Sequence, residues 1–212
     1  MRCATCAIAA AVVVCLAASA SADMMTWDGL GLKSTVRMHA GGSVANNRTV
    51  YAGQMRVTYQ GESYLGYCVD VYQWVGTSEV TEQPLSVLSN PDRIAYLFET
   101  YADGIDTGAE AAALQVAIWE TAFETADTLN VSDGYFRVSR NNTVSSRATE
   151  MLNTWPGSYC PQTALTVLHS AGKQDLLIRR AGDPVPEPAT LLLIGLGGWA
   201  VYRRRTADWL AP

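Results

Sequence analysis

The sequence predicts an α+β domain in which a strand-rich, sandwich-like body carries a helical insertion. Three observations lead to this prediction. Residues 32–75 are rich in β-branched and aromatic residues, residues 90–123 carry helix signals, and residues 163–179 have the pattern of a closing hairpin. Strands that precede and follow a group of helices are typical of an α+β domain.

The first strand-rich stretch is divided by turn signals. The pairs Gly41-Gly42 and Asn46-Asn47 interrupt it, and residues 60–62 predict a tight hairpin turn. Residues 63–74 then predict a strand in which alternation puts Tyr67 on the more apolar face and Cys68 on the opposite one. Gly66 leaves room on the Cys68 side for another element to approach closely.

Helices are predicted from residue 90 onward. Asn90-Pro91-Asp92 has the pattern of a helix start, and Gly104 ends this helix. A second helix is expected from about residue 106 or 107 to Phe123, and it is apolar nearly all the way round, so it must be largely buried. A third helix is predicted over 145–155, and the closing hairpin pairs 163–169 with 175–179.

The N-terminal residues 1–22 predict a cleaved secretory signal peptide. Arg2 precedes an apolar stretch over 7–18, and Ala20-Ser21-Ala22 is a small-residue cleavage site. The domain proper is then expected over 23–183. Cleavage leaves Cys68 and Cys160, and two cysteines in an exported chain favour a disulfide.

Composition limits the classes of partner. The formal net charge is -5, which argues against nucleic acid because that partner requires a basic face. His39 and His169 are the two histidines, and neither lies in a spacing typical of metal ligands. We therefore expect no metal, no cofactor and no nucleic-acid partner.

Two short stretches resemble the half-motifs of the bacterial Cys-Gln thioester (TQXA-type) domain. They are Tyr67-Cys68-Val69-Asp70, at the end of a predicted strand, and Leu114 to Glu120 in the second helix. The resemblance implies that the Cys68 thiol and the Gln115 amide condense into an internal thioester. This family usually has threonine before the glutamine, where this sequence has leucine.

The implied chemistry assigns roles to neighbouring residues. Attack by Cys68 on the Gln115 amide releases ammonia and requires thiolate character and a proton donor. An unreacted buried glutamine must instead be hydrogen-bonded, or it costs about 1–3 kcal/mol. The candidates for proton handling are Asp70 and Glu120, and those for shielding the bond from water are Tyr67 and Trp119.

The resemblance implies a covalent adhesin. An amine on a partner protein or polymer would take the Gln115 acyl group as a stable amide and free the thiol. Such a protein reacts once, so it is not an enzyme.

The C-terminal residues 184–212 resemble the PEP-CTERM sorting signal of Gram-negative bacteria. A Pro-Glu-Pro motif is followed by an apolar run over 191–202 and an arginine cluster. The resemblance implies processing by exosortase, transient anchoring in the inner membrane, and final location on the cell surface or in the extracellular matrix; a plain membrane anchor is the alternative. The residues of the signal are Val185, Pro186, Glu187, Pro188, Arg203, Arg204 and Arg205.

Two other functions compete with the adhesin. One is a non-covalent structural or binding protein of the extracellular matrix or biofilm, with a Cys68–Cys160 disulfide. The other is a secreted hydrolase with a cysteine nucleophile, which requires His39 or His169 as its base.

Overall fold

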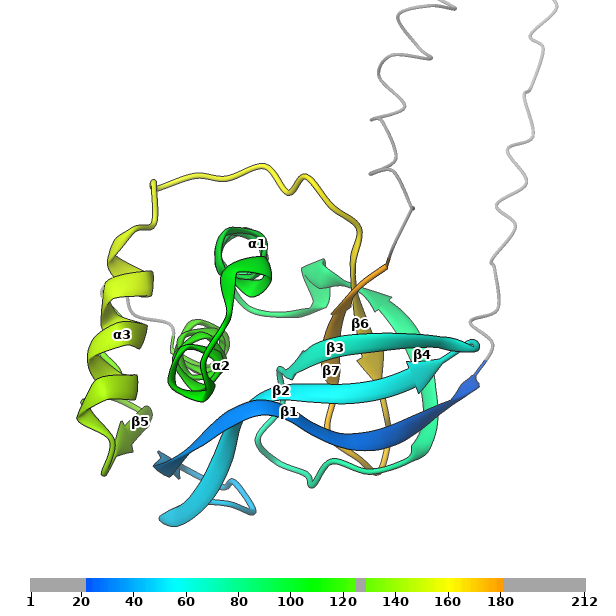
Figure 1. Cartoon of the computed structure of the whole chain (residues 1–212), viewed down its shortest axis with the longest axis horizontal. Coiled ribbons are helices and arrows are strands. Elements are labelled where there is room, and N and C mark those ends of the chain that lie inside the picture. The colour runs from blue at the N-terminus through cyan, green and yellow to red at the C-terminus, as the bar shows by residue number, and fades with distance from the viewer. Residues whose placement is uncertain (1–21, 125–128, 181–212) are drawn as a thin grey trace, which may run out of the picture.

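The computed structural model describes residues 22–124 and 129–180. The helices gather on one side and most of the strands on the other (Figure 1). None of the helices in the described ranges is long and apolar enough to cross a membrane. The predicted signal peptide up to residue 21 and the predicted sorting segment 184–212 lie outside these ranges.

Seven strands form an antiparallel sandwich, as predicted. Their order is β2-β3-β7-β6-β4-β1-β5, and a further pairing of β1 with β2 closes six of them into a ring. The described strands are β1 (Asp23–Ala40), β2 (Arg48–Tyr59), β3 (Glu62–Cys68), β4 (Ser78–Pro84), β5 (Phe136–Ser139), β6 (Leu165–His169) and β7 (Leu176–Arg179).

The two predicted hairpins, at residues 60–62 and between 163–169 and 175–179, are confirmed, and β1 forms a further hairpin with β2. β1 and β2 pair in antiparallel register from Met25 with Tyr59 to Met38 with Arg48, on either side of the Gly-rich turn. β2 and β3 join through Gln60 and Gly61, whose φ angles of 52° and 83° are those that a tight hairpin turn requires.

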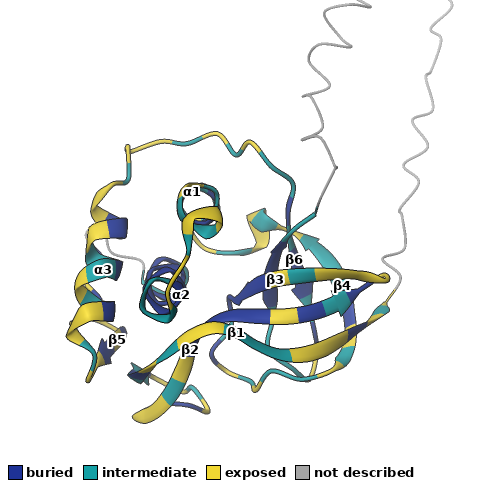
Figure 2. Cartoon of the chain, in the orientation of Figure 1, coloured by how far each residue is buried: buried dark blue, intermediate teal, exposed yellow. Residues whose placement is uncertain are grey.

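The central helix is α2 (Gly108–Phe123), which lies between α1 (Pro91–Tyr101) and α3 (Asn142–Asn153) and packs against β1, β2 and β3. A capping box starts it: Thr107 and Glu110 each bond the other's backbone N–H. All residues from 111 to 121 are buried, as the continuous apolar pattern predicted (Figure 2).

The structure differs from the sequence prediction in five places. β1 begins at Asp23, before the strand-rich stretch predicted from residue 32. β3 ends at Cys68, so residues 69–74 are not strand, and β4 and β5 were not predicted. The third helix begins three residues earlier than expected, at Asn142. The faces of β3 also differ from expectation: Cys68 is fully buried, whereas Leu65 on the face predicted to be apolar is 51% exposed.

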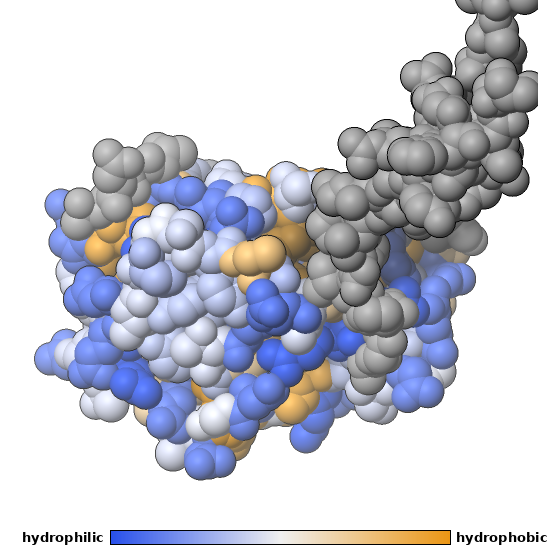
Figure 3. Space-filling view, turned by 90° about the horizontal axis from the view of Figure 1, so that it is seen from above, coloured by the Kyte–Doolittle hydropathy of each residue, from blue (hydrophilic) through white to orange (hydrophobic). Residues whose placement is uncertain are grey.

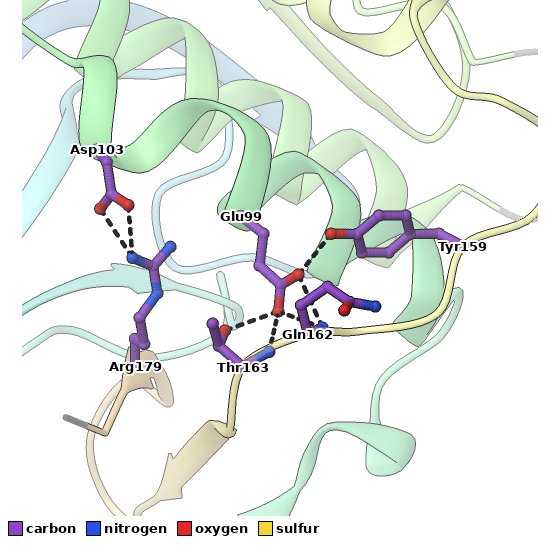
Figure 4. A network of polar contacts seen from close by, with 6 residues as sticks. All are labelled: Glu99, Asp103, Tyr159, Gln162, Thr163 and Arg179. Carbon is purple, nitrogen blue, oxygen red and sulfur yellow. Dashed lines mark hydrogen bonds and ion pairs between the residues drawn. The ribbon is translucent and has the colours of Figure 1, made fainter. Parts of the chain in front are cut away.

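A polar network fixes the long segment between α3 and β6 against α1. The carboxylate of Glu99 accepts hydrogen bonds from the Tyr159 hydroxyl, the Gln162 N–H, and both the N–H and the hydroxyl of Thr163 (Figure 4). Burial alone would raise the pKa of Glu99, but these bonds outweigh it and lower that pKa. The face that Figure 3 shows is mostly polar, with small separate apolar patches.

Candidate functional site

Cys68 lies at the last position of β3, where β7 covers one edge of the strand. Tyr67 pairs with Leu177 and Cys68 pairs with Leu176. The close approach of β7 depends on Gly66, because a Cβ there would lie 2.9 Å from the Leu177 carbonyl oxygen. The expectation that Gly66 makes room for a neighbouring element is confirmed.

Gln115 reaches Cys68 from the other side. Its Oε1 accepts a hydrogen bond from the Cys68 N–H at 2.9 Å, and its Nε2 donates to the Cys68 carbonyl at 2.8 Å. β2 stops pairing with β3 at Gly66, so the Gln115 carboxamide satisfies the next pair of strand peptide groups. The two residues named by the half-motifs are therefore in direct contact, although they are 47 positions apart.

Both residues are excluded from water. Cys68, Gln115 and Leu114 are all 0% exposed. Leu114, which stands where the thioester family usually has threonine, therefore lies in the hydrophobic core.

Gln174 completes the polar surroundings of the thiol. The Cys68 Sγ–H donates to Gln174 Oε1 at 2.8 Å, and Gln174 Nε2 donates to the Asp70 carbonyl at 2.6 Å. The backbone N–H of Gln174 also bonds the Trp74 carbonyl at 3.2 Å. The sequence reasoning did not find Gln174, since a glutamine after a Gly-Lys turn carries no recognisable signal.

The environment of Cys68 favours the protonated thiol. Burial raises the pKa of the Cys68 thiol, and the negative charges of Asp70 and Asp175 raise it further. These surroundings favour the neutral thiol over the thiolate character that the implied chemistry requires.

Of the two acids assigned to proton handling, Asp70 lies beside the thiol. It is half-buried, and its Oδ1 accepts from the Tyr72 N–H at 2.6 Å, which fixes the turn that follows β3. Burial raises the pKa of Asp70, and the charge of Asp175 adds to that rise against the opposing turn hydrogen bond.

Glu120 lies elsewhere. It is five residues beyond Gln115, about 140° round the helix axis, and its Oε1 accepts from the Asn130 N–H at 2.6 Å. Burial, assisted by the charge of Glu124, raises the pKa of Glu120 to about 7. The structure does not bring this carboxyl to Cys68 through any hydrogen bond.

The two aromatic candidates lie on different sides of the site. Tyr67 points away from Cys68 into the core and meets Phe98 edge to face, with ring centroids 5.8 Å apart. Trp119 follows Gln115 by one helical turn on the same face of α2 and is 3% exposed. Both rings are buried, at 1% and 3% exposure, and Trp119 is the one on the Gln115 face of α2.

Among the described residues, no disulfide joins Cys68 to Cys160 and no hydrogen bond joins Cys68 to either histidine. Cys68 and Cys160 are both free, one buried and the other exposed. His169 pairs with Asp175 at 2.9 Å, and His39 contacts Ser139. Within the part of the chain that the structure describes, no cluster of three or more His, Cys, Asp or Glu side chains could hold a metal ion.

The whole chain was compared with curated proteins and with solved structures. No curated protein matches the chain. A solved structure, the N-terminal domain of the Streptococcus pyogenes pilus tip adhesin Cpa, aligns with 13% sequence identity and a TM-score of 0.40, covering 63% of this chain and 84% of that one.

The sorting prediction is supported by a family model. Residues 184–205 match the PEP-CTERM protein-sorting motif, which includes the predicted proline and arginine positions. The chain therefore carries a PEP-CTERM motif, which indicates an exported protein sorted to the cell surface.

Proposed function

We propose that this exported surface protein forms an internal thioester between Cys68 and Gln115, and that the thioester couples covalently to an amine on a partner. The observation that carries the proposal is the pair of hydrogen bonds from the Gln115 carboxamide to the peptide of Cys68, at 2.9 and 2.8 Å. These bonds hold the Gln115 acyl group next to the residue that carries the thiol. Holding the two reacting groups together raises their effective concentration, so the condensation would need no separate catalyst.

The burial of the pair supports the same chemistry. The thiol and the carboxamide are shielded from water, so a thioester formed there is protected from hydrolysis. In the condensation the Cys68 sulfur bonds to the Gln115 carboxamide carbon, and the carbon–nitrogen bond breaks. The thiol proton leaves on the departing ammonia, so the neutral thiol that this environment favours balances the reaction without an external base.

The proposed cellular role follows from the tail. Exosortase would process the chain near Pro186 to Pro188 after transient anchoring in the inner membrane, and the body would then act at the cell surface or in the matrix as a covalent adhesin. Because each molecule reacts once, the proposal describes an adhesin and not an enzyme.

A non-covalent matrix protein is the second candidate. Its support is that the same two hydrogen bonds satisfy the Gln115 amide without any reaction. The disulfide predicted for this candidate is absent from the described part of the chain, because Cys68 and Cys160 are both free. The non-covalent function does not depend on that disulfide.

The intact mass of the full chain, purified without reductant and with its ends determined, distinguishes the two. The thioester predicts a mass that lacks one ammonia, and methylamine treatment replaces this deficit by one methylamine adduct. A mass equal to that of the unreacted chain, unchanged by methylamine, would leave the non-covalent function.

A further inference from the structure

A pocket of about 440 Å³ is lined in part by Gln174, the residue that bonds the Cys68 thiol. Its walls come from β1, β2, the segment after β3, and α2, and four of its lining residues are the aromatic side chains Trp27, Tyr51, Trp74 and Trp119. Three of these rings are unusually exposed for their size: Trp27 by 37%, Tyr51 by 55% and Trp74 by 52%. Tryptophan and tyrosine exposed around a concavity are typical of a binding site.

Two lining residues connect this pocket to the reacting groups. Gln174 lines it and accepts the hydrogen bond of the Cys68 thiol at 2.8 Å. Trp119 lines it one helical turn beyond Gln115. Neither Cys68 nor Gln115 lines the pocket itself, but Gln174 bonds the sulfur from the pocket wall and Trp119 lies on the same face of α2 as Gln115.

Thioester formation would change the role of Gln174. The sulfur of a thioester carries no proton, so Gln174 Oε1 would lose the donor that it has in the free thiol. Gln174 Nε2 would still be held by the Asp70 carbonyl at 2.6 Å, which keeps the amide in place. The freed oxygen would then be a fixed acceptor for an N–H group arriving from the pocket.

The chemistry of the walls selects the form of the arriving group. Among the described residues that line the pocket, none has a charged side chain. Burying an ammonium there would be costly, whereas the neutral amine, which is also the nucleophilic form, fits. At the rim, the Lys33 ammonium already lies 5.5 Å from the centroid of the Tyr51 ring, and its positive charge would repel a second ammonium there.

We propose that this pocket is the acceptor site of the thioester, that it takes a primary amine on an unbranched apolar stem, and that Gln174 is the positioning residue that orients the amine nitrogen. This inference rests on the proposed function. In the step, the amine nitrogen bonds to the Gln115 acyl carbon and the carbon–sulfur bond breaks. One amine proton passes to the sulfur, which restores the Cys68 thiol.

The test measures aminolysis of the full chain by intact mass, with methylamine and n-hexylamine over a range of concentrations. We expect n-hexylamine to react at least about tenfold faster than methylamine at low concentration, because its additional methylene groups are buried in the pocket. Val50→Trp, which fills the pocket, is expected to reduce that ratio to less than about threefold. Val87→Trp, at an exposed position outside the pocket, is the matched control and should keep the native ratio.

Gln174→Met tests orientation separately from binding. In molecules that carry the thioester, we expect the maximal rate to fall about tenfold while the half-saturating n-hexylamine concentration stays the same. A merely structural role would raise that concentration as well. A normal maximal rate, or failure of the variant to form the thioester at all, would overturn the orienting role.

The outcomes separate the two proposals. If the native chain shows no ammonia deficit, the proposed function fails and the acceptor site fails with it. If the deficit is present but the two amines react equally fast, or Val50→Trp keeps the native ratio, the thioester stands and the acceptor site alone is overturned.

Discussion

The carboxamide of Gln115 is bonded to both peptide groups of Cys68, so that a side chain from the central helix takes the place of a neighbouring strand at the end of β3. The contact therefore affects both the stability of the fold and the proposed thioester chemistry. The same contact satisfies two buried backbone groups and holds an acyl donor beside a thiol.

Replacing Gln115 with methionine should destabilise the fold. The apolar side chain fills a similar volume but leaves the Cys68 N–H and carbonyl without partners in the core, which costs about 2–4 kcal/mol. Urea unfolding measures the loss. Gln162→Met is the control, because Gln162 is exposed and the bonds it makes to Glu99 come from its backbone; its effect should stay within about 0.5 kcal/mol. Equal stability of the two variants would contradict this role of Gln115.

Gly66→Ala should destabilise the junction of β3 and β7. The added Cβ would lie 2.9 Å from the Leu177 carbonyl oxygen and 3.1 Å from Ile178 Cγ2, so β7 has to shift, at about 1–3 kcal/mol. Gly172→Ala, in the turn before β7, meets nothing within 4 Å and should change stability little. Thermal unfolding of both variants compares them, and a Gly66→Ala chain as stable as the control would show that β7 yields freely.

Glu120→Gln should stabilise the chain at alkaline pH. The folded-state pKa of about 7 exceeds the ordinary value of 4.5, so the folded state binds more protons than the unfolded state between these values, and stability falls as the pH rises through that window. Glutamine removes this loss and can still accept from the Asn130 N–H. We expect a gain of about 1–3 kcal/mol at about pH 8 that vanishes near pH 4.

Denaturant titrations at the two pH values test this prediction. A gain of the same size at both would mean that the effect of Glu120 comes from packing and not from its ionisation.

Glu99→Gln should have the opposite pH dependence. The carboxylate has a lowered pKa in the folded state, so its stabilisation is present above the unfolded-state value and is lost as the pH falls through the folded-state value. At neutral pH the variant should lose about 1–2 kcal/mol, because glutamine cannot accept all the bonds from Tyr159, Gln162 and Thr163. As the pH falls through the lowered folded-state pKa, the native chain and the variant should converge. A difference that does not depend on pH would contradict the assignment.

The parts of the fold that were predictable have local signals. The proline at position 91, the nearly continuous apolar run over 111–119 and the Gln60-Gly61 turn each act over a few residues, and they located α1, α2 and the β2–β3 hairpin. β4 was missed because it contains two glutamates and a terminal proline and buries mainly Val80, so neither its composition nor its alternation distinguishes it from a loop.

The candidate site was predictable only where a motif names the residue. The half-motifs identified Cys68 and Gln115, and alternation and helix periodicity gave their elements. Gln174 was not predictable, since its position depends on how β7 pairs with β3, a contact between residues more than one hundred positions apart. Glu120 was assigned from its nearness to Gln115 in sequence, and helix geometry carries it to another side of α2.

The most direct test of the central claim is peptide mapping of the chain after methylamine treatment, with the thiols alkylated afterwards. The thioester predicts N-methylglutamine at position 115 and an alkylated thiol at position 68 that is unreactive before methylamine, and neither change in Cys68→Ala. Unmodified glutamine at 115, in a native chain whose Cys68 alkylates equally with and without methylamine after unfolding, would contradict the thioester and leave a non-covalent surface protein.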